Sequence, residues 1–393
     1  MSDRVVIVGA GHAGGACAIA LRDNGFSGSI VMVGEEAHPP YERPSLSKSF
    51  LEAPSTPDFL ATADRWAELA VELRLGVEVV AVDREARTVT LSDGLSLPYD
   101  RLVVATGGHA RRLPFPSRPG VHYLRHVEDA LGVADAAAAG GCAVVIGGGV
   151  IGLEVASTLR GRGMEVTVVE AGDRLLGRNV PREAAGWLAD AHQRVGVDIR
   201  LGRSVASLSG ESPLTLTLDD GSILTADFVV AGIGIVPAVG FLVAAGLAEA
   251  GGVPVDSQYR SLVDPAVYAI GDVALRTNAS AVAGRMETWA HAQSSARAAA
   301  LSIAGLPPEA EPAPWFWTDQ CGQTLQIVGR PELADTVVPR GDNVRLYMSG
   351  DALVGAACLD QPRDFGALRR LIGTSLSVER ARDPAIDLRR AAA

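Results

Sequence analysis

The sequence predicts an α/β fold with two Rossmann-like dinucleotide-binding domains, because two similar glycine-rich turns lie about 140 residues apart. The first turn is Gly9-Ala10-Gly11-His12-Ala13-Gly14, and the second is Gly147-Gly148-Gly149-Val150-Ile151-Gly152. Each turn follows a short apolar run and precedes an acidic residue, Glu35 or Glu170, that comes about 20 residues later. A strand, a GxGxxG turn, a helix and an acid in this order are typical of a βαβ unit that binds a dinucleotide.

Each part of this motif has an expected physical role. The first glycine allows a tight turn, the second lets backbone N–H groups approach a pyrophosphate, and the third lets the helix pack close to the strand. The positive end of the helix dipole faces the phosphates, and the acid accepts from the ribose hydroxyls. The residues expected at the phosphates are Gly9, Gly11, His12, Ala13 and Gly14 in the first turn and Gly147, Gly149, Val150, Ile151 and Gly152 in the second.

One glycine-rich turn is weak evidence in a chain that has 44 glycines. Two complete copies of the motif are stronger evidence, because each has its strand, helix and acid in the same order. A protein that binds two dinucleotides usually passes electrons between them, so the sequence predicts an oxidoreductase.

The expected elements repeat in the two halves of the chain. After the first βαβ unit we expect a meander over 77–97, with a hairpin turn at Asp93-Gly94, and then a strand over 101–105. After the second βαβ unit we expect a meander over 214–224 and a closing strand over 229–235.

The remaining third of the chain shows different patterns. A strand over 267–270 and a long alanine-rich helix over 287–303 are expected, followed by a proline-rich, acidic linker over 306–314. The segment after the linker alternates with period two, which indicates a sheet. Its expected strands and closing helix span 324–328, 344–348, 353–358 and 363–372.

The composition excludes several classes of protein. A net charge of −11 argues against a nucleic-acid partner. The four cysteines are widely spaced and form no CxxC motif, so we expect free thiols, no metal site and a cytoplasmic location. Charged residues lead directly into the first strand, so we expect no signal peptide. Residues 228–248 carry no charge, but Pro237 and several glycines interrupt them, so we expect no membrane insertion.

Six segments carry a resemblance to one family, and they are 9–14, 41–48 (Tyr-Glu-Arg-Pro-Ser-Leu-Ser-Lys), 105–108, 147–154, 268–273 and 314–320 (Pro-Trp-Phe-Trp-Thr-Asp-Gln). Together they resemble the FAD-dependent, NADH-dependent ferredoxin reductases that supply electrons to bacterial cytochrome P450s and Rieske-type oxygenases. The resemblance runs through essentially the whole chain in the same order. Ser45 stands where the family usually has a second proline, and Ala238 stands where asparagine is frequent.

This resemblance implies a glutathione-reductase-like fold. Residues 1–110 and 237–311 would form a discontinuous FAD-binding domain, and residues 111–236 would form an NAD-binding domain inserted into it. Residues 312–393 would form a C-terminal α+β domain.

Lys48 is the only lysine among the 35 lysine and arginine residues of the chain. A single lysine can remain on a surface by drift, but the context between Pro44 and the apolar Phe50 favours a specific role. A compact ammonium beside the flavin N5 edge favours the anionic reduced form, and a planar guanidinium has a different reach. The resemblance implies that Lys48 pairs with Glu154 and that both are catalytic.

The resemblance also implies the other flavin contacts. Glu35 would hold the adenosine ribose, and Asp272 would accept from the ribityl chain. The helix that starts near Glu287 would point N–H groups at the flavin N1/O2 edge, where negative charge develops on reduction. Trp317 would close over the isoalloxazine ring. The remaining expected contacts are Arg43, Val79, Ala105, Thr106, Gly107, Arg125, Gly271, Thr288 and Trp289.

Thiol chemistry at the flavin is not expected, since no cysteine lies between Gly25 and Gly141. Hydride transfer from NADH to non-covalently bound FAD needs positioning rather than a protein acid or base. Glu170 would repel a 2′-phosphate and so favour NADH over NADPH. The chain has no four-cysteine cluster ligand set, so the electrons would leave to a separate [2Fe–2S] ferredoxin.

Two alternatives remain open at this stage. The acceptor could be rubredoxin instead of ferredoxin. The chain could also be a non-enzymatic, NADH-responsive flavoprotein resembling apoptosis-inducing factor. Such relatives tend to carry extra targeting or basic segments, and this sequence has neither, which favours the enzyme.

Overall fold

The computed structural model describes residues 3–178, 180–277 and 284–388, which group into two compact units. The first unit comprises Met1–Arg43, Pro57–His109 and Ile235–Pro312. The second unit comprises Pro44–Thr56, Ala110–Gly234 and Ala313–Ala393. No helix among the described residues is long and apolar enough to cross a membrane. The outer ends of the predicted first and last domains, residues 1–2 and 389–393, lie outside the described residues.

A parallel sheet of five strands in the order β19-β7-β1-β2-β3 forms the centre of the first unit. The apolar run at the N-terminus becomes the central strand β1, whose apolar side chains are buried in the core of this unit. The five strands are β1 (Arg4–Val8), β2 (Ser29–Gly34), β3 (Val71–Leu75), β7 (Arg101–Val104) and β19 (Val267–Ala269).

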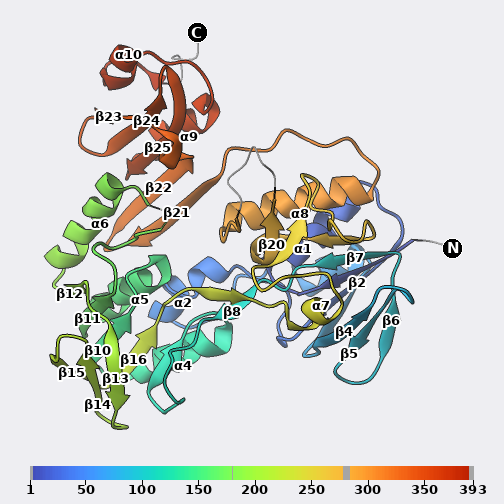
Figure 1. The fold of residues 1–393 in the computed structure, drawn as a ribbon, viewed down its shortest axis with the longest axis horizontal. Helices are drawn as coiled ribbons and strands as arrows, with labels where there is room; N and C mark the ends of the chain where they lie inside the picture. Colours follow the sequence, from blue (N-terminus) through green and yellow to red (C-terminus); the bar gives the residue numbers. More distant parts are fainter. Residues whose placement is uncertain (1–2, 179, 278–283, 389–393) are drawn as a thin grey trace. The chain divides into compact units, whose positions relative to one another are not determined.

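Helices α1 (His12–Asp23) and α8 (Trp289–Ile303) lie side by side in the first unit (Figure 1). Both helices bury several alanines, and such small side chains allow close approach of the two helices. The other elements of this unit are β4 (Val79–Asp83), β5 (Thr88–Leu91), β6 (Ser96–Pro98), β17 (Ile235–Pro237), β18 (Val253–Val255), β20 (Ala274–Arg276), α3 (Ala63–Glu68), α7 (Gly240–Ala244), η2 (Gly271–Val273) and, reaching into the second unit, β8 (Gly108–Ala110) and η1 (Arg43–Ser45).

The second unit repeats this design with a parallel sheet in the order β12-β11-β10-β16-β9. Strand β10 occupies the place that β1 has in the first unit, and the meander β13-β14-β15 follows it in sequence. The elements are β9 (Val121–Tyr123), β10 (Cys142–Ile146), β11 (Glu165–Glu170), β12 (Asp198–Leu201), β13 (Val205–Ser209), β14 (Leu214–Leu218), β15 (Ile223–Ala226), β16 (Phe228–Ala231), α2 (Ser49–Glu52), α4 (Val127–Ala138), α5 (Val150–Gly161) and α6 (Arg182–Arg194).

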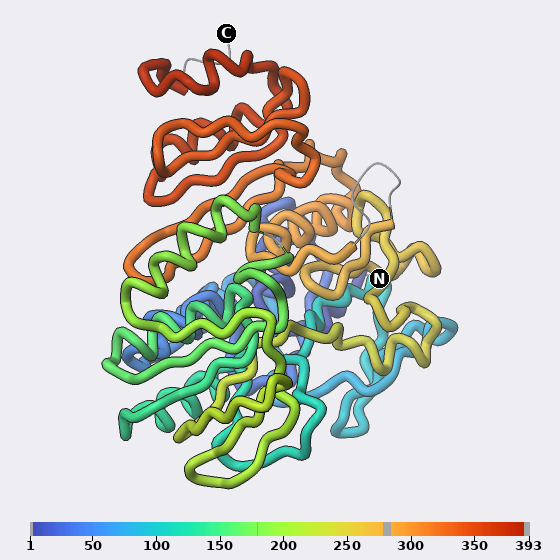
Figure 2. Tube along the Cα trace, turned by 60° about the vertical axis from the view of Figure 1, so that its left-hand side comes forward, coloured from blue at the N-terminus to red at the C-terminus, as the bar shows by residue number. Residues whose placement is uncertain are grey.

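An antiparallel sheet in the order β21-β22-β25-β24-β23 completes the second unit. Helix α6 lies against its strands β22 and β25 (Figure 2), so apolar side chains of both parts share one core. The elements are β21 (Trp315–Gln320), β22 (Gln323–Gly329), η3 (Pro331–Leu333), β23 (Thr336–Arg340), β24 (Val344–Ser349), β25 (Ala352–Leu359), α9 (Pro362–Leu371) and α10 (Val378–Arg382).

The expected α/β fold with a C-terminal α+β part is confirmed, but one expected strand is wrong. The sequence predicts a single strand over 229–235, whereas the structure has β16 and β17 with a break between them. The break falls at Gly232 and Gly234, and Gly234 has a φ of +97°, which a continuing strand cannot have. The segment Pro44–Thr56, inside the range expected for the FAD-binding domain, packs within the second unit.

Candidate functional site

The first glycine turn has the geometry that a phosphate-binding turn needs. Gly9 has a φ of +112°, and a Cβ there would lie 2.2 Å from the carbonyl oxygen of Ala105. A Cβ on Gly14 would lie 2.0 Å from the carbonyl oxygen of Gly9, so this position admits glycine alone without a shift of the backbone. Gly11 is the N-cap of α1, and no side chain caps the helix. The N–H groups of the first helical turn are therefore available to a ligand.

The second turn reproduces this geometry in the second unit. Gly147 has a φ of +107°, and a Cβ there would lie 2.4 Å from the carbonyl oxygen of Gly232. A Cβ on Gly152 would lie 2.1 Å from the carbonyl oxygen of Gly147. Gly149 is the N-cap of α5, again with no capping side chain.

The middle glycines distinguish a ligand-binding turn from a merely tight one. Around Gly149, no described residue beyond its chain neighbours and its own helix has a heavy atom within 4 Å of a Cβ position, and at Gly11 the nearest such atoms belong to the flexible end of Arg43 at 3.6 Å. Packing therefore explains the outer glycines but not the middle ones. Close approach of a pyrophosphate to the backbone explains the middle ones, so both turns fit a dinucleotide.

Residues expected at one dinucleotide come together in the first unit from distant parts of the sequence. The rings of His12 and Trp289 have centroids 5.1 Å apart. The Nε1–H group of Trp289 donates to Glu42 over 2.5 Å, and Nδ1 of His12 lies 3.3 Å from the same carboxylate oxygen. A Cβ on Gly271 would lie 2.9 Å from Cβ of Ala13, so η2 adjoins the start of α1.

Arg43 lies beside the same turn, where Glu36 and Tyr41 hold its guanidinium. Its Nη2 atom is 2.6 Å from a carboxylate oxygen of Glu36, and its Nη1–H group donates to the hydroxyl of Tyr41 over 3.3 Å. The guanidinium also lies over the Tyr41 ring, 5.2 Å from its centroid. These contacts keep a cation next to Gly11, where phosphate oxygens would come.

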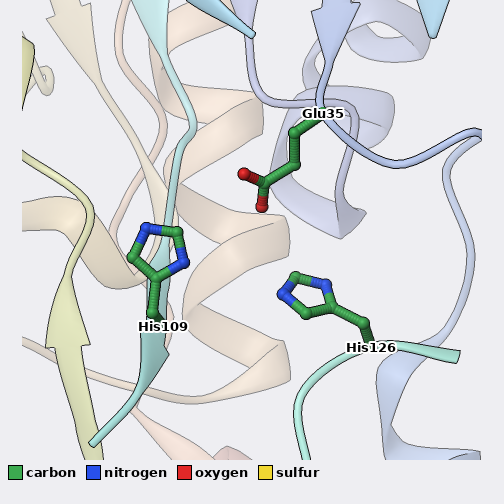
Figure 3. Close-up of side chains that lie close together, drawn as sticks. All are labelled: Glu35, His109 and His126. Carbon is green, nitrogen blue, oxygen red and sulfur yellow. The ribbon is translucent and has the colours of Figure 1, made fainter. Parts of the chain in front are cut away.

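Glu35 follows β2 directly, and its side chain is exposed. His109 on β8 is exposed as well, and an oxygen of Glu35 lies within 4.8 Å of a His109 ring nitrogen (Figure 3). An acceptor at the end of the second strand has the position that ribose recognition requires. The sequence interpretation missed His109, although it directly follows the expected 105–108 turn.

Glu170 holds the corresponding place in the second unit, and the backbone fixes its carboxylate. One oxygen accepts from the N–H of Gly148 over 2.6 Å, and the other accepts from the N–H of Gly172 over 2.7 Å. Each oxygen keeps a second lone pair for a ribose hydroxyl. Arg174 donates to the carbonyl oxygens of Gly177 and Val180 over 2.8 and 2.9 Å, so its guanidinium holds the following loop.

The expected partners Lys48 and Glu154 form an ion pair within the second unit, with Nζ 2.9 Å from Oε1. Glu154 on α5 is 2% exposed, and the Lys48 ammonium also donates to the carbonyl oxygen of Pro44 over 3.0 Å. The hydroxyls of Ser47 and Thr318 both donate to the Glu154 carboxylate, the latter over 2.6 Å. Burial raises the pKa of Glu154, while Lys48 and the two hydroxyls oppose the rise.

The sequence interpretation missed Ser47 and Thr318. The signal was present, because Ser47 precedes the unique lysine and Thr318 lies in the 314–320 segment. The buried carboxylate needs more than one donor, and these hydroxyls supply the others.

The other expected residues lie as follows. Thr106 donates through its hydroxyl to the carbonyl oxygen of Ala238 over 2.9 Å, and the Ala238 N–H donates to Gly107 over 3.1 Å, so this turn closes without an asparagine. Thr288 caps α8 by accepting from the N–H of His291 over 3.1 Å. Glu287 pairs with Arg285 at 2.7 Å. Val79 begins β4, Ala105 follows β7 and Asp272 lies in η2, while Arg125, before α4, and Trp317, on β21, belong to the second unit.

The four cysteines are free thiols. Burial raises the pKa of Cys17 and of Cys358 to about 12, which keeps both protonated. Burial also raises the pKa of Cys142 and Cys321. These shifts all favour the protonated thiol over the thiolate, which is the nucleophilic form.

Comparison with known proteins gives the same class of protein. A family model described as pyridine nucleotide-disulphide oxidoreductase matches residues 3–296, and one described as reductase C-terminal matches residues 315–392. The chain therefore belongs to the pyridine nucleotide-disulphide oxidoreductase family, whose members use FAD and NADH.

Its relatives are reductases of oxygenase systems. The ferredoxin–NAD(+) reductase component of the p-cumate 2,3-dioxygenase system of Pseudomonas putida is 40% identical over 98% of both chains. Rhodocoxin reductase of Rhodococcus erythropolis is 37% identical over 99% of this chain and 94% of its own. The crystal structure of the ferredoxin reductase for the CYP199A2 system of Rhodopseudomonas palustris superimposes with a TM-score of 0.94, at 35% identity and full coverage of both chains. Putidaredoxin reductase in its covalent complex with putidaredoxin also gives 0.94, at 34% identity over 99% and 98% of the chains.

Gly149 and Gly152 of the second turn differ in what surrounds an added Cβ, and this difference yields a testable prediction. Gly149→Ala adds a methyl group in open space at a φ of −80°, so the melting temperature should stay the same or rise slightly. The methyl group should still keep a pyrophosphate away, and NADH binding measured by calorimetry should weaken about tenfold or more, which equals about 1.4 kcal/mol. Gly152→Ala is the matched control. It should lower the melting temperature, because its Cβ meets a carbonyl oxygen. Unchanged NADH affinity in Gly149→Ala would contradict this account of the turn.

Proposed function

We propose that this protein is a flavoprotein reductase that passes electrons from NADH, through one non-covalently bound FAD, to a [2Fe–2S] ferredoxin. That ferredoxin would in turn supply a cytochrome P450 or a Rieske-type oxygenase. The observation that carries the proposal is the presence of two similar glycine turns in one chain, each with an open middle glycine and an acid at the end of the strand that follows its helix. The relatives named above, which are reductases of such systems, support it.

Each turn is assigned one dinucleotide. FAD would bind at the first turn with Glu35 at its ribose, and NADH would bind at the second turn with Glu170 at its ribose. We assign residues 1–110 and 237–311 to the FAD-binding domain, 111–236 to the NAD-binding domain and 312–393 to the C-terminal domain. The free thiols and the acidic charge support a cytoplasmic location.

When bound, FAD accepts a hydride from NADH and releases electrons singly. The protein's part is to orient the two cofactors and to supply charge. We propose that Lys48 contacts the flavin N5 edge and that Glu154 keeps the lysine charged and in place, because their ion pair is buried and close. Because the raised pKa values of the four cysteines disfavour thiolates, we propose the flavin as the sole electron carrier within the chain.

The first prediction concerns Lys48. Lys48→Met should slow flavin reduction by NADH at least about tenfold in stopped-flow measurements, because the positive charge is lost and a buried carboxylate remains unpaired. Lys48→Arg should restore the charge but not the geometry and recover only part of the rate. Arg65→Met removes an exposed, Glu68-paired cation and serves as the control, with no expected change. A wild-type rate in Lys48→Met would remove Lys48 from the mechanism.

The second prediction concerns coenzyme choice. The wild-type protein should prefer NADH strongly to NADPH, since the Glu170 carboxylate repels a 2′-phosphate. Glu170→Ala should narrow the ratio of the two reduction efficiencies about tenfold, which is about 1.4 kcal/mol. Glu165→Ala, at the other end of β11 and exposed, should leave the ratio unchanged. The prediction fails if the wild-type protein uses both coenzymes equally well.

The third prediction concerns the surface on which the ferredoxin docks. This chain is acidic, and acidic ferredoxins would be repelled by its net charge, so docking needs a local basic patch. Arg363, Arg369 and Arg370 on α9 are exposed, and the Arg369 guanidinium lies over the Trp315 ring, 4.5 Å from its centroid. We propose this helix as the docking patch, with Arg111 and Arg112 as second choice.

Reversal of Arg369 and Arg370 to glutamate should raise the KM for ferredoxin about tenfold at low salt and less at high salt. NADH-to-ferricyanide activity should stay intact. The same reversal of Arg380 and Arg382, exposed on α10, is the control for charge alone. Cytochrome c reduction with ferredoxins and rubredoxins added in turn identifies the acceptor. The absence of activity with every ferredoxin would reject the proposed function, and an unchanged KM in the double variant would reject the patch.

A further inference from the structure

A chain of buried polar side chains continues from the Lys48–Glu154 pair into the C-terminal part of the second unit. Strand β21 alternates, so that Thr318 and Gln320 share one face and Asp319 lies on the other. Thr318 is 0% exposed and Gln320 is 2% exposed, although a buried strand face is normally apolar. Buried polar groups at two successive inward positions require partners.

The partners come from two helices. The Thr318 hydroxyl donates to Glu154 on α5 over 2.6 Å, and the Gln320 amide donates to the Thr318 hydroxyl over 2.8 Å. The Gln320 carbonyl oxygen lies 2.9 Å from Nε2 of His192 on α6, which is 0% exposed. One connected chain therefore joins α6, β21, α5 and the lysine segment.

The donor and acceptor of each hydrogen bond in this network follow from the Glu154 carboxylate at one end of it. The Glu154 carboxylate only accepts, so the Thr318 hydroxyl must donate to it. The Thr318 oxygen is then free to accept from the Gln320 amide, which turns the Gln320 carbonyl oxygen toward His192. His192 must therefore carry its proton on Nε2, and burial lowers the pKa of His192 and keeps the ring neutral.

The hydrogen-bond network ends on Oε1 of Glu154, which is also the oxygen that pairs with Lys48. Oε1 of Glu154 accepts from both Thr318 and Lys48, while Ser47 donates to the other oxygen. Without the Thr318 donor, burial would raise the pKa of Glu154 further, since less would oppose it. Besides Glu154 itself, Lys48 and His192 are the titratable groups on this network. Asp319 belongs to the opposite face of β21, where Thr324 donates to it over 2.7 Å.

We propose that Thr318, Gln320 and His192 are positioning residues that fix the Glu154 carboxylate as the partner of Lys48, so that the C-terminal part of the chain sets the charge of this pair. The consequence for flavin chemistry rests on the function proposed above. The positioning itself is a property of the second unit and can be tested without any turnover.

The sequence offers a direct probe, because Lys48 is the only lysine. Growth with [ε-¹³C]lysine gives a holoprotein with one lysine signal, provided that the purification tag carries none. As the pH falls, protonation of Glu154 should displace this signal and produce an inflection. Thr318→Val should move the inflection upward by about one pH unit, because a hydroxyl donor to the carboxylate is lost. Gln320→Leu should move it in the same direction by less.

Matched variants separate positioning from a structural effect. Thr318→Ser keeps the hydroxyl, and Thr324→Val removes a hydroxyl that donates to Asp319 in the same hairpin, so both should keep the wild-type inflection. If circular dichroism shows that Thr318→Val does not fold, the pH inflection of Gln320→Leu tests the proposal instead. A wild-type inflection in the folded variants, or no inflection in the wild-type protein, would overturn the proposal. Failure to reduce a ferredoxin would leave this result unaffected, so the two failures are distinguishable.

Discussion

The buried carboxylate of Glu154 is the constraint on which the second unit depends. An ionised carboxylate that is 2% exposed is very costly unless it is paired and hydrogen-bonded. Its partners come from sequence positions more than a hundred residues away on either side, namely Ser47 and Lys48 before it and Thr318 after it. The need to satisfy one charge thus fixes where the lysine segment, α5 and β21 meet. A lysine held in this way is available for chemistry because its alternative conformations would leave the carboxylate unpaired.

The two glycine turns show how a ligand requirement can be separated from a packing requirement. The outer glycines are dictated by carbonyl oxygens that would lie 2.0 to 2.4 Å from an added Cβ. The middle glycines have no such neighbour in the described parts of the chain, and their freedom is explained by a phosphate that approaches the backbone. Because the same division appears in both units, it favours a dinucleotide site in each of them. One protein that holds two dinucleotides in this way is built for electron transfer.

Local patterns in the sequence predicted much of this protein, and contacts between distant segments account for what was missed. The turns at 9–14 and 147–152, the acids Glu35 and Glu170 and most strands follow from periodicity and spacing, which are local. The break between β16 and β17 was missed because apolar residues flank its glycines without interruption. The chain from Thr318 to His192 was missed because it joins residues more than a hundred positions apart. The only local indication of this network was the polar inward face of β21. Residue spacing alone cannot show which side chains pair with that face.

In the proposed function, the flavin is a converter between a two-electron donor and a one-electron acceptor. The number of ferredoxins reduced per NADH under anaerobic conditions tests this conversion most directly. Holoprotein, limiting NADH and an excess of an oxidised [2Fe–2S] ferredoxin are mixed, and the NADH and cluster absorbances are followed together. Two ferredoxins should be reduced for each NADH consumed, and the flavin should be oxidised again at the end. NADH consumption that leaves every ferredoxin oxidised and the flavin reduced would contradict it.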